Sequence, residues 1–397
     1  MSSLPEQTTP VSGALATTAI GPLEHPVSHV RIFFLDHLRV ALTILVVLHH
    51  LALIYGAGAA FYYLEPPTGD LLAFLVLLAF VLMNQGYFMG CFFLISGYFT
   101  PGSFDHKGPA AFLKDRALRL GIPLLIFVLV LSPLASIGLY YWASGVKGSF
   151  ISLYPTLIGV GPLWFVEMLL FFCLGYIIWR LLGRERRQPG ERVFGLPSYR
   201  AVGLFILALA TASYLMRVVV PMGVTIPIFG FPTLSYLPQY LSFFVLGVIA
   251  FRRNWFQTIP GSMGRTGFIV ALVATMVLFP LAVLSSTTGA TFLGQGSWQS
   301  AVYALWDSTF SVGMCLGLLT FFRRFFNQPG KPGRFLSRHA YTVYIIHAPI
   351  IVLLALALRG VHLESLLKFV LAALIGVPLC FVLAFLVRKI PFASRIL

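Results

Sequence analysis

Residues 70–99 read DLLAFLVLLAFVLMNQGYFMGCFFLISGYF and are almost entirely apolar. A helix needs about 20 apolar residues to cross the hydrocarbon core of a bilayer, so this stretch predicts a transmembrane span. Asn84, Gln85 and Gly86 interrupt it near its middle. The interruption indicates either one long kinked or tilted helix or two shorter helical pieces.

Similar apolar runs occur along the rest of the chain. The composition agrees with a membrane protein, because 58% of the 397 residues are hydrophobic and only 10% are charged, against about a quarter in soluble domains. The sequence therefore predicts an all-α, polytopic integral membrane helical bundle with about ten transmembrane helices. We place these spans at roughly 33–55, 70–99, 119–142, 162–182, 200–218, 233–251, 266–285, 299–322, 340–358 and 365–387.

The basic residues are distributed unevenly between the two sides of these spans. All 27 lysines and arginines except Lys147, Arg217, Arg359 and Lys368 lie near the termini or in the connections after even-numbered spans. The positive-inside rule then predicts cytoplasmic N- and C-termini, and we expect the protein in the plasma (inner) membrane. The rule also explains the net charge of +15 without a nucleic-acid partner.

The terminal segments and the cysteines carry little chemistry of their own. Residues 1–30 contain no Lys or Arg, so they lack the basic start of a signal peptide and predict a disordered cytoplasmic tail. Residues 31–390 form the predicted membrane domain, and 391–397 a short cytoplasmic C-terminal tail. The four cysteines are expected to be packing residues without a metal site: Cys91, Cys173, Cys315 and Cys380.

The first span, FFLDHLRVALTILVVLHH (residues 33–50), contains unusual polar groups. At about 100° per residue, Asp36, Arg39, Thr43 and His50 share one stripe, and His49 points nearly a right angle away. Arg39 and His50 are separated by roughly 16 Å along the axis. Inserting an ionisable group into the membrane costs at least ~2.5–3.5 kcal/mol. The stripe therefore indicates a functional role for these residues. The alternative is that Asp36 and Arg39 snorkel to the interface and His50 is a hydrogen-bonded core histidine.

Other spans also carry ionisable residues. Glu167 and Asp307 are expected in the outer half of the membrane, as is His50. His347 is expected in the inner half. Arg116 and Arg119 stand at i, i+3 and are expected on one helix face. Helix-to-helix hydrogen bonds are the alternative for the two acids, and ordinary positive-inside charge is the alternative for the two arginines.

Four segments together resemble the membrane-bound acyltransferase family 3, in its branch typified by glucan biosynthesis protein C. They are Arg39 with His50, GCFFLISGYF (90–99) followed by Arg116 and Arg119, PLWFVEMLLF (162–171), and RHAYTVYIIHAPI (338–350). The resemblance implies transfer of an acyl group, acetyl or succinyl, from cytoplasmic acyl-CoA to a hydroxyl of a glycan or related acceptor at or beyond the outer face. Acyl-CoA is then a donor substrate, and no bound cofactor is expected.

The resemblance also implies roles for individual residues. His50 becomes the essential histidine with Arg39 as its motif partner. Apart from the resemblance, Asp36 and Glu167 are added to the predicted catalytic set as ionisable groups inside spans. Arg116 and Arg119 are expected to bind the phosphates of the donor, which suits the arginine fork. An imidazole can take the proton of an attacking hydroxyl, or His50 can be acylated and relay the group. These two mechanisms stay open.

Two other function classes fit parts of the same pattern. Intramembrane charges also mark proton and substrate paths in secondary transporters, but no matched pair of interrupted spans indicates the inverted repeat common among them. A sensor or assembly protein without chemistry is the third reading. No firm role follows for Asp307 or His347, and neither the acyl group, the acceptor nor the oligomeric state follows from the sequence.

Overall fold

The computed structural model describes residues 32–58, 61–65, 69–136, 149–183, 195–224, 234–286, 291–328 and 330–397. The predicted N-terminal tail, 1–30, lies outside these residues, as do the charges of Lys147, Arg184, Arg186, Arg187 and Arg192. Residues Phe33–Leu397 form one unit. The predicted C-terminal tail, 391–397, contains a short helical turn.

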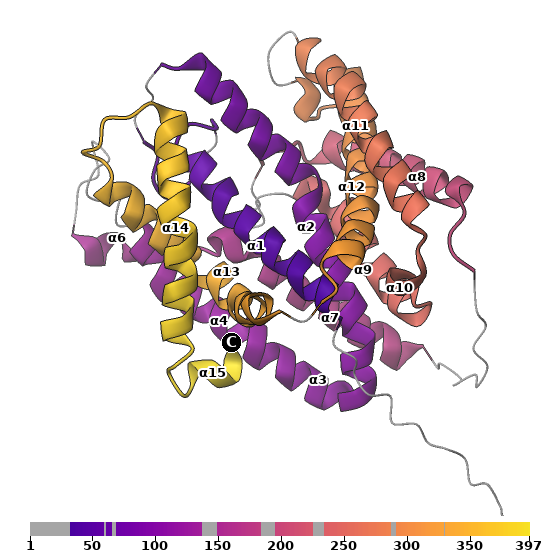
Figure 1. The fold of residues 1–397 in the computed structure, drawn as a ribbon, viewed down its shortest axis with the longest axis horizontal. Coiled ribbons are helices and arrows are strands. Elements are labelled where there is room, and N and C mark those ends of the chain that lie inside the picture. The colour runs from indigo at the N-terminus through magenta and orange to yellow at the C-terminus, as the bar shows by residue number, and fades with distance from the viewer. Residues whose placement is uncertain are drawn as a thin grey trace, which may run out of the picture. The chain divides into compact units, whose positions relative to one another are not determined.

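Every regular element in the described ranges is helical (Figure 1). The helices are α1 (Phe33–Ile54), α2 (Leu71–Lys107), α3 (Pro109–Arg116), α4 (Ile122–Ile126), α6 (Phe150–Leu157), α7 (Trp164–Leu182), α8 (Tyr199–Val219), α9 (Leu237–Arg252), α10 (Trp255–Thr258), α11 (Gly261–Leu284), α12 (Trp298–Phe325), α13 (Lys331–Ala357), α14 (Ser365–Val387) and α15 (Ala393–Ile396). Ten helical stretches in this described part of the chain are long and apolar enough to span a membrane. The predicted all-α, multi-pass class is therefore confirmed.

Several spans begin or end at other positions than the hydropathy of the sequence predicts, among them the fourth, which begins at Phe150 instead of 162, and three others extend through polar residues. The second is the single continuous helix α2, which reaches Lys107, so the two-piece alternative is wrong. The third begins at Pro109 instead of 119, and α13 begins at Lys331 instead of 340. Polar residues prolong each helix beyond the hydrocarbon core, and a search for apolar residues detects only the part inside the core.

The most buried spans are α1, α12 and α13, whereas α8 and α11 expose most of their side chains. α1 contacts α2, α12, α13 and α14, and Figure 1 shows it, in indigo, between α2 and α14. His50, Asp307 and His347 belong to these three buried spans. Ionisable groups in a membrane protein face the bundle interior, and this placement positions the candidate site.

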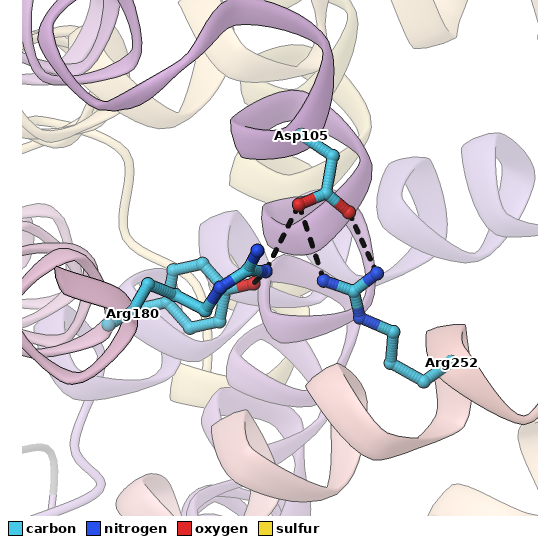
Figure 2. Close-up of polar contacts among 4 residues, drawn as sticks. Asp105, Arg180 and Arg252 are labelled. Atoms are coloured by element: carbon cyan, nitrogen blue, oxygen red, sulfur yellow. Dashed lines mark hydrogen bonds and ion pairs between the residues drawn. The ribbon is translucent and has the colours of Figure 1, made fainter. Parts of the chain in front are cut away.

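One end of the bundle carries an ion-pair cluster that joins three helices. We call this end of the bundle the basic end. Helix α1 begins there, and helices α2, α7, α9 and α12 end there. Asp105 of α2 accepts from Arg180 Nη1 of α7 at 3.0 Å and pairs with Arg252 Nη1 of α9 at 2.8 Å. Figure 2 shows both guanidinium groups converging on this carboxylate. The cluster ties together helix ends that are distant in sequence.

Glycines allow α2 and α9 to pack backbone against backbone. A Cβ added at Gly97 would lie 2.0 Å from the carbonyl oxygen of Phe244, and one at Gly247 would lie 2.1 Å from that of Leu94. Small residues at membrane helix contacts permit this close approach, which stabilises the pair through dispersion contacts and interhelical hydrogen bonds.

We expect Gly97→Ala to lower the thermal stability of the purified protein strongly, because the added methyl group meets backbone that cannot rotate away. The cost should reach or exceed the ~1–3 kcal/mol of ordinary overpacking. Thermal unfolding in detergent measures it. Gly175→Ala in α7 is the matched control, since a Cβ there meets no atom within 4 Å. Equal stability of the two variants would contradict the packing argument.

Candidate functional site

A cavity of about 220 Å³ opens between α1, α2, the third span, α7 and α13. Its walls include Thr43, Phe99, Leu120, Phe165 and Tyr344. Two cationic side chains, Arg39 and Arg116, also line it, and none of the described lining residues is an aspartate or glutamate. The cavity is therefore an apolar slot with two positive charges and no opposing acid in its lining.

Arg39 stands where α1 enters the membrane from the basic end. Its Nη1 lies 3.5 Å from Oδ1 of Asp36, one turn earlier, and its guanidinium lies 6.0 Å from the centre of the Phe99 ring. The Thr43 hydroxyl donates to the Arg39 carbonyl at 2.9 Å. The predicted α1 stripe therefore points Arg39 and Thr43 into the cavity, and Asp36 balances part of the Arg39 charge.

The third span separates Arg116 from Arg119. A π-helical turn, Ala117–Gly121, begins directly after Arg116 and changes the angle between successive side chains. Arg116 lines the cavity over the Phe112 ring at 4.8 Å, and its buried Nε has no hydrogen-bond partner among the described residues. The exposed Arg119 pairs instead with Asp115 at 3.1 Å. Of the two arginines predicted to act together, only Arg116 therefore lines the cavity.

His50 meets His347 in the bundle interior. His50 Nδ1 lies 2.8 Å from the Val46 carbonyl oxygen and 3.3 Å from Nε2 of His347. His347 Nδ1 lies 2.7 Å from the carbonyl oxygen of Tyr344, whose side chain lines the cavity. The two histidines therefore lie one helical turn beyond the Tyr344 end of the cavity.

The protons of this pair are assigned from the heavy-atom contacts. A carbonyl oxygen can only accept, so Nδ1 of His50 and Nδ1 of His347 both donate. His347 Nε2 then carries a lone pair that faces the His50 Nδ1–H. As a consequence, Nε2 of His50 keeps its own lone pair for another proton. The pair therefore presents one ring nitrogen that can act as a base.

The contact corrects the expected depths of the two residues. The sequence placed His50 in the outer half of the membrane and His347 in the inner half, yet their rings lie 5.0 Å apart. α13 begins at Lys331, earlier than predicted, so His347 lies further along its helix and reaches the depth of His50. His49 is directed elsewhere, as expected, and stacks on Phe88 of α2 at 5.0 Å.

Residues 61–65 cover His50 on the side away from the basic end. The Phe61 ring lies 4.7 Å from that of His50, and the Tyr62 hydroxyl lies 3.2 Å from Ser132 Oγ. Glu65 accepts from the buried Nζ of Lys368 at 2.5 Å and from the Tyr63 hydroxyl at 2.8 Å. Burial and the bond to Glu65 raise the pKa of the Tyr63 hydroxyl. The segment is thus held over His50 by charged and neutral hydrogen bonds.

The two remaining membrane acids lie apart from this histidine pair. Glu167, in the first turn of α7, has a buried Oε2 without a hydrogen-bond partner in the described structure, and it does not line the cavity. Asp307 forms a fully buried ion pair with Arg217 of α8 at 2.6 Å. The sequence treated Arg217 as an outer-side charge, so this pair was missed. Its signal was a single acid inside the apolar part of one span and an arginine far from the basic end of another.

Comparison with known proteins identifies the family. The chain matches the acyltransferase 3 family, described as an acyltransferase domain, over residues 32–387. The chain belongs to the acyltransferase 3 family. Proteins named glucans biosynthesis protein C from Salmonella schwarzengrund (strain CVM19633) and Salmonella heidelberg (strain SL476) are 27% identical to it over 232 residues. The match covers 56% of this chain and 58% of each relative, little more than half their length. No solved structure matches the chain.

In this acyltransferase 3 chain, sequence reasoning singled out the residues of α1 but missed their partners. His347 was noticed without a role, and the buried link between Glu65 and Lys368 was not found. Groups of three or more metal-ligating side chains are absent from the described residues. The candidate site is therefore a histidine pair beyond a cationic cavity.

Proposed function

We propose that this multi-pass membrane protein is an O-acyltransferase that transfers an acyl group from acyl-CoA to a hydroxyl of a glycan or related acceptor. The observation that carries the proposal is the unused Nε2 of His50. The contacts of Nδ1 with the Val46 carbonyl and with His347 leave this Nε2 free as a proton acceptor at the end of a cationic cavity. Membership of the acyltransferase 3 family supports the same reaction class.

The cavity suits the acyl end of the donor. Its volume of about 220 Å³ is below the ~300–1,000 Å³ of pockets that bury a drug-sized ligand. It is therefore too small for the whole of acyl-CoA, and we assign it to the acyl end of the pantetheine arm, with the nucleotide outside at the basic end. Arg116 and Arg39 supply guanidinium forks for phosphate oxygens near the mouth. Arg119, exposed and paired with Asp115, contributes less.

The reaction needs one proton to move. The acceptor hydroxyl attacks the thioester carbonyl and transfers its proton to His50 Nε2. The tetrahedral intermediate expels the CoA sulfur, which takes the proton back as the thiol. His347 acts as a positioning residue, because its Nε2 accepts from His50 Nδ1 and holds the base in the productive tautomer. Acyl transfer through His50 itself is the competing mechanism.

The two sides of the site then serve different substrates. The positive-inside rule places the basic end, and the mouth of the cavity, in the cytoplasm of a plasma-membrane protein. The acceptor approaches His50 from the opposite side, past Phe61. A transporter has less support, because the buried charges of Arg217 and Lys368 are each paired with an acid and do not line the cavity.

The proposal is tested by measuring the release of CoA in proteoliposomes. The donors are acetyl-CoA and succinyl-CoA, each with and without a glucan acceptor. Acceptor-dependent release with an ester on the glycan is the expected result. Absence of both donor binding and donor turnover in folded protein would reject it. An acyl group trapped on His50 in the absence of acceptor would select the relay mechanism.

Arg116→Gln is expected to weaken acyl-CoA binding about 10- to 100-fold, which corresponds to loss of one charge-assisted hydrogen bond. Arg119→Gln, in the same span, is the matched control and should change the affinity less than about threefold, since its charge is exposed and already paired. Calorimetric titration with a non-hydrolysable acyl-CoA analogue measures both. A larger effect at Arg119 would contradict the assignment.

A further inference from the structure

A second cavity, of about 230 Å³, lies between α2, α8, α9, α10 and α12. Its lining is apolar throughout and includes Leu94, Val202, Phe205, Leu246, Trp255 and Leu316. It shares no lining residue with the Arg39 cavity: Leu94 faces this space, whereas the next residue of α2, Ile95, faces the other. The proposed reaction therefore does not use this second cavity.

The cavity lies in the half of the bundle that adjoins the basic end. Its lining residues come from the first turns of α8, the last turns of α9 and the second half of α12. Arg323 of α12 donates to the Phe256 carbonyl at 2.9 Å, and the Phe256 ring stacks on Tyr98 of α2 at 4.4 Å. These contacts fix α10 as one wall, so the cavity is part of the packed structure.

Polar groups at one edge of this cavity complement an anion. The indole Nε1 of Trp255 is buried and has no acceptor within the described residues. The guanidinium of Arg253 lies over the Trp255 ring at 5.4 Å, and the Arg253 side chain is exposed. Arg200, at the start of α8, is also exposed. An indole N–H and an arginine beside an apolar slot suit the phosphate of a lipid at a membrane interface, where aromatic and basic residues gather.

We propose that this cavity binds an anionic phospholipid of the leaflet at the basic end. One acyl chain fills the apolar space between α8, α9 and α12. The phosphate accepts the Trp255 Nε1–H and lies beside Arg253. A phospholipid fits better than the acyl donor, because the donor's proposed cavity is separate, lies on the other side of α2 and contains Arg116.

Native mass spectrometry and thermal unfolding of the purified full-length protein test the site, with phosphatidylglycerol, phosphatidylcholine and palmitoyl-CoA as probes. We expect wild type to retain phosphatidylglycerol about tenfold more tightly than phosphatidylcholine, the size of one lost charge-assisted contact. Val202→Trp, which fills the cavity, should remove this retention. Leu204→Trp, on the exposed face of the same helix, is the matched control and should bind like wild type.

Two milder variants keep the test independent of folding. Trp255→Phe retains an aromatic ring and removes the donor to the phosphate, which both lipids carry, so it should weaken retention of phosphatidylglycerol and phosphatidylcholine alike. Arg253→Gln removes the charge and should reduce the preference for phosphatidylglycerol. Equal retention by Val202→Trp and wild type would overturn the proposal. Binding of phosphatidylcholine as tight as that of phosphatidylglycerol would also overturn the proposal. Displacement of the lipid by palmitoyl-CoA would overturn it too, and would indicate a donor site instead. The readout does not depend on acyltransferase activity.

Discussion

His50→Ala should lower the rate of acyl transfer by roughly 10²- to 10⁴-fold, the usual contribution of a general base. Donor affinity should stay close to that of wild type, because His50 does not line the Arg39 cavity. The measurement is kcat for CoA release with a glycan acceptor, alongside binding of a non-hydrolysable donor analogue. Loss of turnover with retained binding is the expected signature.

The neighbouring histidines provide controls for this result. His49→Ala is matched in chemistry and position, and its ring stacks on Phe88 away from His347, so transfer should be little affected. His347→Ala removes one of the two acceptors that orient His50, the other being the Val46 carbonyl, and loss of such a partner typically costs about 10- to 100-fold. His347→Gln, which can offer a carbonyl oxygen to the His50 Nδ1–H, should recover part of the rate. Comparable losses at His49 and His50 would contradict the assigned base.

The second large effect concerns stability. Asp307→Ala should destabilise the folded protein by ~3–5 kcal/mol, because it leaves the Arg217 guanidinium buried without its counter-ion. Two tyrosine rings, Tyr236 and Tyr303, enclose that guanidinium at 4.8 and 5.4 Å, so water cannot easily replace the carboxylate. Thermal or denaturant unfolding in detergent measures the loss.

A double variant separates the lost pair from the uncompensated charge. Asp307→Leu with Arg217→Met removes both charges, and apolar replacement of a buried pair is often neutral or stabilising. Its stability should therefore exceed that of Asp307→Ala. Asp115→Ala breaks two more exposed pairs, with Arg119 and with Lys107, and should cost about 1 kcal/mol or less for each. A double variant as unstable as Asp307→Ala would show that packing, and not the buried charge, is responsible.

The site was only partly predictable, and the reason differs between residues. Arg39 and Thr43 both reach the cavity because the helical repeat within a single span places them on one stripe. Arg116 lines the cavity without Arg119, and a π-helical turn follows Arg116, which the periodicity of the sequence does not reveal. His347 was placed at the wrong depth, since its helix continues through polar residues to Lys331.

The all-helical class and the ten spans follow from the amino-acid sequence, because each apolar segment must by itself be long enough to cross the hydrocarbon core. Contacts between spans depend on the depth and rotation of every helix, and these are set by packing, as at Gly97 and Gly247 of α2 and α9. His50 and His347 are 297 residues apart in the chain, yet they share a hydrogen bond. No local pattern in either span encodes that meeting, so the histidine pair emerges only when the helices pack.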